Sequence, residues 1–212
     1  MSRPGSIPRG RHAPPLEVRL EVQRQRLLNA AAAVFARHGY AKASAEAISR
    51  EAGMSKATFY EHFMNKEDAI LSLFDESTAR LASRMAEATA MVPEEPEAQI
   101  RAGGQAFVAA LVEDPDAAQT LLVEIIGAGP RAVERRDAVL ERFAALVDAE
   151  NAAAHRRHGT PRFASPHDAF AIVGGVVELC SRHLRLGIPE DLEELEPVIE
   201  RLALGVLYGT RE

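Results

Sequence analysis

Residues 44–63 read SAEAISREAGMSKATFYEHF, and this stretch decides the fold of the chain. Ser44 is placed to cap a first short helix, because its hydroxyl can accept a hydrogen bond from an unpaired backbone N–H of the first turn. Gly53 then ends that helix, since glycine adopts the left-handed conformation without a steric cost. Ser55 follows and is placed to cap a second helix. The spacing predicts two short helices joined by a tight turn.

The apolar residues of this stretch fall on the inner side of both helices. They are Ile48, Ala52, Met54, Phe59 and Phe63. A helix-turn-helix needs such a set to hold its second helix outward. The arrangement predicts a helix that lies in the major groove of DNA.

Charge is distributed unevenly along the chain. The whole sequence is acidic, with 25 Lys and Arg against 31 Asp and Glu. Residues 1–66 nevertheless hold 11 basic and 5 acidic residues, which leaves 14 and 26 for residues 67–212. Basic charge that coincides with a helix-turn-helix favours nucleic-acid binding, although charge alone is equally typical of a solvated helix surface.

Composition is that of a globular protein, with 47% apolar and 26% charged residues. No uncharged apolar run is long enough to cross a membrane, and the N-terminal MSRPGSIPRGRHAPP lacks the apolar segment of a signal peptide, so we expect a cytoplasmic protein. The single Cys180 lies in an apolar helical run, where a buried and inert thiol is expected. Nothing in the sequence implies a cofactor.

Glycines, prolines and capping residues divide the chain into about nine helices, and no period-two pattern predicts a strand, so the fold class is all-α. One predicted helix precedes the motif, at about 20–38. Those that follow it cover about 66–92, a segment ending near 112, then 114–127, 130–158, 166–187 and 191–208. The last of these is expected to be broken or kinked at Pro197. We expect three regions: a flexible basic arm (1–18), a three-helix DNA-binding head (19–66) and a larger ligand-binding and dimerisation body (67–212). The arm carries Arg3, Arg9 and Arg11, which could follow the minor groove or belong to an unstructured tail.

The last two long helices indicate a dimer. Residues 170–186 carry apolar residues on two faces, and a helix of this kind must bury both. A two-fold partner could cover one of them, with Gly174 and Gly175 allowing close approach; a single large core is the alternative. The predicted interface consists of Ile172, Val176, Leu179, His183, Leu195, Ile199, Leu202 and Val206.

The stretch HGYAKASAEAISREAGMSKATFYEHFMNKEDAI, residues 38–70, closely resembles the N-terminal signature of the TetR (tetracycline repressor) family. The resemblance covers about 45 residues and implies a homodimeric repressor. Such a protein binds a palindromic DNA operator and releases it when a small molecule enters the C-terminal body.

The same resemblance assigns roles to individual residues. Base edges would be contacted by Lys56, Ala57, Thr58 and His62, and phosphates by Tyr60, Lys66, Ser44 and Ser55. Ala43 departs from the family pattern, which usually has a phosphate-binding threonine there, and Ser44 could replace it.

An effector cavity is expected in the body, where an apolar or amphipathic molecule would tilt the fourth helix and change the separation of the two heads. Its predicted walls are Thr78, Phe107, Leu111, Phe143, Val147, Asn151 and Phe170, with Glu124 and His155 as further polar candidates. An apolar stripe looks the same around a ligand as around a side chain, so plain core is the alternative for each of them.

Two other functional classes are alternatives. An enzyme would need converging catalytic groups, and the nearest metal-like pair, His155 and His158, lacks a carboxylate or thiolate nearby in sequence, so neither a catalytic nor a metal site is predicted. A helical interaction or ligand-binding module that has lost DNA binding is the other alternative, because Ala43 and Ala57 are small where contacts are expected.

Overall fold

The computed structural model describes residues 15–209, and in that range the chain forms nine α-helices and two short 3-10 helices without any strand. The all-α prediction is therefore confirmed. In chain order the elements are α1 (Leu16–Lys42), α2 (Ala45–Glu51), α3 (Lys56–His62), α4 (Lys66–Ala90), α5 (Pro96–Glu113), α6 (Pro115–Leu122), η1 (Glu124–Ala128), α7 (Pro130–His158), α8 (Pro166–Leu186), η2 (Leu192–Leu195) and α9 (Glu196–Tyr208).

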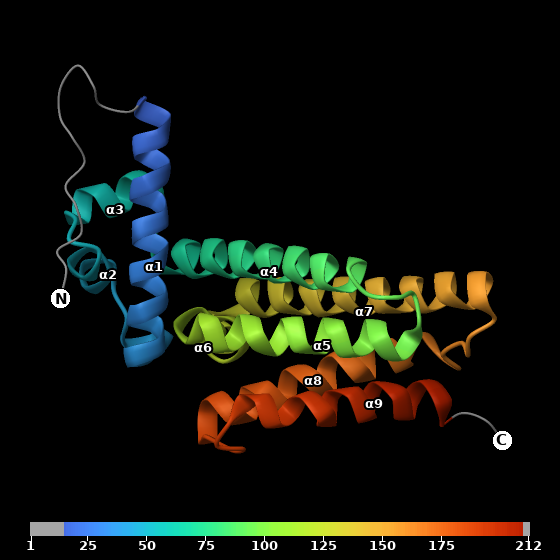
Figure 1. Ribbon diagram of the computed structural model, residues 1–212. Coiled ribbons are helices and arrows are strands. Elements are labelled where there is room, and N and C mark those ends of the chain that lie inside the picture. Colours follow the sequence, from blue (N-terminus) through green and yellow to red (C-terminus); the bar gives the residue numbers. More distant parts are fainter. Residues whose placement is uncertain (1–14, 210–212) are drawn as a thin grey trace.

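A three-helix head stands at one end of a long helical body (Figure 1). Helix α1 runs crosswise to the body helices, with α2 and α3 on its outer side. Helix α4 leads from the head into the body, where it packs on α5, while α5 packs on α9 and α7 packs on α8. Helices α8 and α9 therefore form one long side of the body.

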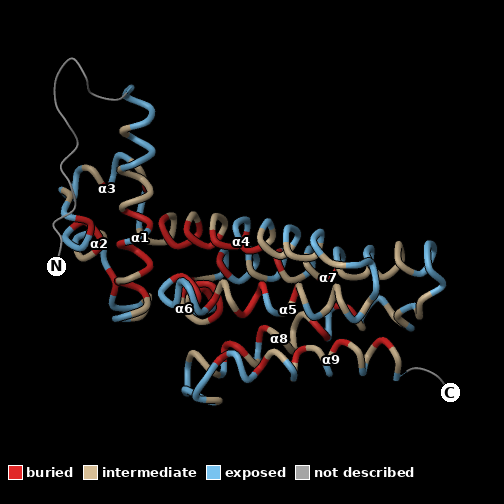
Figure 2. Tube along the Cα trace, viewed as in Figure 1, coloured by how far each residue is buried: buried red, intermediate tan, exposed pale blue. Residues whose placement is uncertain are grey.

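The first helix begins earlier than the sequence indicated. Residues 1–14, with the arginines of the expected arm, lie outside the described residues. Leu16 to Val18, which the sequence places in the arm, form the first turn of α1. Leu16 and Val18 are exposed, so this turn has no buried apolar face that could reveal it (Figure 2). The sequence signals for a helix start here are Pro15 before the helix and the acidic Glu17 in its first turn.

The helix breaks occur close to their predicted positions. Gly39 interrupts α1 with φ 75°, as expected of a glycine that stops a helix. The helix that starts at Asp114 and Pro115 ends at Leu122 and continues as η1. The last segment divides into η2 and α9 just before Pro197, where a break or kink was expected.

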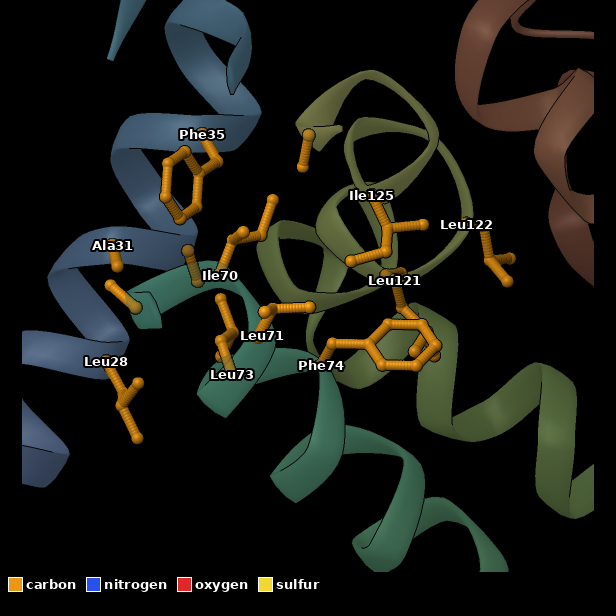
Figure 3. Close-up of a cluster of buried hydrophobic side chains, with 14 of the residues drawn as sticks. Leu28, Ala31, Phe35, Ile70, Leu71, Leu73, Phe74, Leu121, Leu122 and Ile125 are labelled. Carbon is orange, nitrogen blue, oxygen red and sulfur yellow. The ribbon is translucent and has the colours of Figure 1, made fainter. Parts of the chain in front are cut away.

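The head and the body share one hydrophobic core. Side chains of α1, α4, α6 and η1 meet where the head joins the body (Figure 3). Phe35 of α1, Ile70 of α4 and Ile125 of η1 are completely buried at this joint. Burying a side chain of this size contributes roughly 1.5–3 kcal/mol, so the joint is a substantial part of the folding free energy.

Candidate DNA-binding head and effector cavity

The two motif helices begin at the predicted serine caps. Ser44 Oγ accepts a 3.1 Å hydrogen bond from the Ala47 N–H, and Ser55 Oγ accepts a 3.0 Å bond from the Thr58 N–H. Each hydroxyl acts as an acceptor in its cap and is exposed. The O–H of Ser44 therefore stays available to donate to a phosphate, whereas the Ser55 Oγ also lies 3.0 Å from Thr58 Oγ1.

The turn between α2 and α3 has a support that sequence reasoning missed. Gly53 has φ 64°, as predicted for the residue that ends α2. Arg26 of α1 donates from Nη2 to the Ala52 carbonyl at 2.8 Å, next to that glycine. Arginine is a common partner for the last carbonyls of a helix, but nothing in the sequence indicates that a residue of α1 supplies it.

Helix α3 divides into an inward and an outward side. Phe59 and Phe63 are buried, which confirms the predicted core positions. Lys56, Ala57 and Tyr60 are exposed on the outward side, and the Lys56 ammonium lies 5.9 Å from the centre of the Tyr60 ring. Thr58 is only half-buried. The outward side thus presents a cation, a small residue and an aromatic ring.

His62 is less free than the sequence suggested. It is half-buried, and its ring centre lies 6.3 Å from that of Phe63. Its Nε2 atom is buried and has no hydrogen-bond partner among the described residues. Nε2 therefore cannot reach a base edge in this conformation, because the last turn of the short helix α3 points it inward.

Lys66 has a different partner from the one expected. Its Nζ atom donates to the carbonyls of Tyr40, Ala41 and Ala43 at 2.8, 3.2 and 3.1 Å, and it lies 4.4 Å from the centre of the Tyr40 ring. An ammonium has three donors, so none is left for a phosphate. In this structure Lys66 therefore binds the segment 39–43, which begins at the Gly39 break and leads into α2, and its phosphate contact stays a prediction.

Glu124 also belongs to this joint and not to the effector cavity, where it was placed as a polar candidate. Its Oε2 accepts a 2.7 Å hydrogen bond from the backbone N–H of Tyr40, and its Oε1 accepts a 3.2 Å bond from Gln119 Nε2. Residues 39–43 are therefore held by Lys66 of α4 and by Glu124 of η1. We call this stretch, with its break at Gly39, the strap.

A cavity of about 610 Å³ lies within the body. Its walls are mostly apolar and come from α4, α5, α6, α7, α8 and α9. Five predicted wall residues line it: Thr78, Phe107, Phe143, Val147 and Asn151. Ile172, Val176 and Ile199, which were predicted at a dimer interface, line it as well.

Two predicted wall residues lie elsewhere. Leu111 is buried in the hydrophobic core but does not line the cavity. Phe170 is 44% exposed on the outside of α8. Both belong to regular apolar stripes, and periodicity alone does not tell which stripe faces the interior.

The polar groups predicted in the cavity are largely engaged by the protein itself. Asn151 donates to the Pro161 carbonyl at 2.9 Å and accepts from the Phe163 N–H at 3.0 Å, while His155 Nδ1 lies 2.6 Å from the Thr160 carbonyl. Both side chains therefore hold the connection between α7 and α8. The Thr78 hydroxyl donates to the carbonyls of Phe74 and Asp75 at 2.9 and 3.0 Å.

The end of the body remote from the head carries an ionic cluster. Glu94 Oε2 lies 3.1 Å from both Arg157 Nε and His158 Nε2. The hydrogen bond from His158 and the charge of Arg157 lower the pKa of the Glu94 carboxyl below its ordinary value. Within residues 15–209, no three His, Cys, Asp or Glu side chains come together in a way that could hold a metal ion.

Three predicted dimer residues are buried inside the chain. Ile172, Leu195 and Ile199 are at most 7% exposed, so they cannot form a surface for a partner, because this chain's own helices cover them. Leu179, Leu202 and Val206 are half-buried, as are Val176 and His183.

The two glycines of α8 have different surroundings. A Cβ atom on Gly175 would lie 2.9 Å from Cδ2 of Leu202, so this glycine admits a helix of its own chain. A Cβ atom on Gly174 would meet nothing within 4 Å, and the same holds for Gly205 of α9. Gly174 of α8 and Gly205 of α9 therefore each face open space, and we refer to the surface around them as the open face of α8 and α9.

None of the helices described by the structure is long and apolar enough to span a membrane.

Fold and site together define a helical protein with a helix-turn-helix head and a cavity-bearing body. The model of the family "Bacterial regulatory proteins, tetR family" matches residues 27–73. These residues run from the middle of α1 to the first turns of α4, and include both motif helices. The head of this chain therefore matches the DNA-binding region of TetR-family regulators.

Individual relatives are similar mainly in the head. The "Fatty acid metabolism regulator protein" of Bacillus subtilis (strain 168) is 38% identical over 61 residues, which are 29% of this chain and 31% of that protein. The matched segment thus spans only about a third of the length of that relative. The name of this relative is that of a regulator protein and not of an enzyme.

Solved structures share the fold over most of the chain. The fatty acid degradation regulator FadR from Bacillus halodurans has a TM-score of 0.79 at 22% identity, covering 88% of this chain and 96% of its own. The transcriptional regulator FadR from Bacillus subtilis, solved in complex with stearoyl-CoA, has a TM-score of 0.76 at 19% identity, covering 88% and 99%. At this level of identity, the likeness shows the fold alone.

Proposed function

We propose that this protein is a ligand-responsive transcriptional regulator, a homodimer that represses genes by binding a palindromic operator and releases it when an apolar or amphipathic effector enters the body. The observation that carries the proposal is the outward side of α3, where Lys56, Ala57 and Tyr60 are exposed on a basic head. Repression, in preference to activation, follows from the resemblance of the motif to a repressor family.

DNA binding follows from the geometry of the head. Ser55 caps α3, and Arg26 of α1 binds the end of α2 just before the turn into α3, so we infer that the exposed side of α3 can enter a major groove. Binding of the chain to its own upstream DNA tests this, and affinity should fall steeply as salt rises, because phosphate contacts release counterions. A chain that binds no DNA at any salt concentration would support the alternative, a ligand-binding module without a reading function.

A dimer would place two copies of α3 on one face of the duplex, with the symmetry of a palindromic site. The open face of α8 and α9 is the surface that we propose for the contact. Gly174 and Gly205 have open space around them, and the half-buried Val206 follows Gly205 in α9. Sedimentation of the full chain measures the assembly directly.

An effector with a long apolar part fits the cavity, whose walls are mostly apolar and whose volume is about 610 Å³. A structural neighbour was solved with stearoyl-CoA, and we propose an acyl compound as the effector here. Calorimetric titration with stearoyl-CoA, with and without operator DNA, tests this. Because coupling is reciprocal, equal affinity in both titrations would remove the proposed response.

The route from cavity to head is short. Leu121 and Leu122 of α6 line the cavity, and Glu124 two residues later holds the strap. The N-terminus of α4 holds the same strap through Lys66, while Thr78 and Leu81 further along α4 line the cavity. A ligand that displaces α6 or tilts α4 would therefore move the strap and, with it, the start of α2.

A further inference from the structure

Among residues 15–209, the half-buried Arg136 of the cavity donates no hydrogen bond to the protein. Arg136 lies in the second turn of α7 and lines the cavity, with its side chain 24% exposed. Its nearest acid is its own neighbour Asp137, at 3.6 Å between Nη1 and Oδ1. That distance is too long for a hydrogen bond, and the Asp137 side chain is 58% exposed. The guanidinium donors of Arg136 are thus left without a close partner in this part of the chain.

Most other polar side chains of the cavity are already paired. Thr78 and Asn151 bond to backbone groups, as does Gln99, whose Nε2 donates to the Thr89, Val92 and Pro93 carbonyls. Arg157 pairs with Glu94. Glu150 is exposed, and it lies 14 residues further along α7, which is about 21 Å in a helix. Arg136 therefore differs from them, because its guanidinium N–H groups are free to donate to a ligand beside the apolar walls.

We propose that Arg136 binds the acidic head group of an amphipathic effector, a long-chain carboxylic acid, and so makes the cavity selective for acids over neutral molecules of the same shape. The proposal rests on the proposed function, because it concerns the effector cavity. A guanidinium beside apolar walls favours a partner that satisfies its donors, and a carboxylate does so with two parallel hydrogen bonds. A neutral alcohol can accept a hydrogen bond from the guanidinium, but it provides neither the opposite charge nor the two parallel bonds of a carboxylate.

The cavity also has the right shape for a chain that starts at Arg136. From Arg136 to Ala154, both of which line it, α7 runs for 18 residues, or about 27 Å. The cavity-lining residues of α7 that follow Arg136 are apolar up to Val147: Val139, Leu140, Phe143, Leu146 and Val147; Glu150 and Asn151 come only after them. An acid bound at Arg136 would lay its hydrocarbon chain along this row, away from the head.

Calorimetry of the full-length protein with dodecanoate and with dodecanol tests the assignment. The wild type should bind the acid about tenfold or more tightly than the alcohol, since charge-assisted hydrogen bonds form only with the acid. In Arg136→Gln the affinity for dodecanoate should fall to that for dodecanol. Arg135→Gln is the matched control, because Arg135 is more exposed and pairs with Asp75, and it should keep the preference.

Several results would overturn the assignment: equal binding of acid and alcohol by the wild type, no binding of either, or a preference that survives in Arg136→Gln. Circular dichroism checks that each variant is folded, and Arg136→Met provides a second variant of similar length if Gln disturbs the helix. Failure of the regulatory role is a separate outcome. It appears as acid binding that depends on Arg136 while the affinity for DNA stays the same with and without dodecanoate.

Discussion

The carboxylate of Glu124 accepts a 2.7 Å hydrogen bond from the backbone N–H of Tyr40, across 84 residues of sequence. The bond joins η1, which follows two cavity-lining leucines, to the strap that leads into the helix-turn-helix. It is thus a direct polar connection between the body and the head.

Replacing Glu124 with alanine should weaken the coupling between effector and DNA. Without the carboxylate, a displacement of α6 is no longer passed to the strap through a hydrogen bond. The ratio of stearoyl-CoA affinities without and with operator should move toward one, while cavity binding itself persists, because Glu124 does not line the cavity. Glu134→Ala, an exposed position on α7, is the control. An unchanged ratio in Glu124→Ala would exclude the bond from the coupling.

Lys66→Ala distinguishes a structural role from a phosphate contact. Loss of three bonds from a charged donor should lower the free energy of unfolding by about 1–3 kcal/mol, measured by urea denaturation. The slope of log affinity against log salt should stay as in the wild type, because no phosphate contact is lost. If the slope in Lys66→Ala were instead smaller by about one unit and the free energy of unfolding unchanged, Lys66 would contact a phosphate, as the sequence suggests.

Gly174→Arg tests the proposed dimer surface. The monomer should fold at least as well as the wild type, because a Cβ atom there has open space and glycine is a poor helix former. A bulky cation from each copy should nevertheless force the subunits apart, so sedimentation should report a monomer and operator affinity should drop. Gly127→Arg, at an exposed glycine with open space around it, serves for comparison in the sedimentation experiment. If Gly174→Arg were still a dimer, the interface would have to lie on another surface of the chain.

The thiol of Cys180 should be inert in the folded protein. Burial raises its pKa from 9.0 to about 12, so at pH 8 it stays neutral and should not react with a disulfide reagent until the chain is denatured. The unfolded chain releases this proton at lower pH than the folded one, so the stability linked to the thiol is present below about pH 9 and is lost as pH rises toward 12. Rapid labelling of the native protein at pH 8 would contradict this assignment.

Local signals explain why the head could be predicted from the sequence. The caps at Ser44 and Ser55 and the glycine between the two helices act within a few residues, and the structure places each where the pattern indicated. The outward side of α3 follows from the same local geometry, because the buried positions Phe59 and Phe63 fix its rotation.

Long-range partners explain what the sequence could not indicate. Lys66 and Glu124 are polar residues whose partners are backbone groups of the strap, and a backbone group leaves no pattern in the sequence. Helix α8 shows a related limit: Phe170 and Val177 belong to one of its two apolar faces and Ile172 to the other, yet Ile172 and Val177 are buried while Phe170 is exposed. Which stripe meets a neighbouring helix, the cavity or a partner is decided by tertiary packing.

The single core shared by the head and the body means that the DNA-binding region is a separate unit in function but not in folding. Phe35 of α1 and Ile125 of η1 belong to the same buried cluster, so a fragment cut after residue 66 would expose the apolar side of α1 to water. Such a fragment would be expected to aggregate or stay unfolded, and transplanting this head onto another protein would require carrying α4, α6 and η1 along with it.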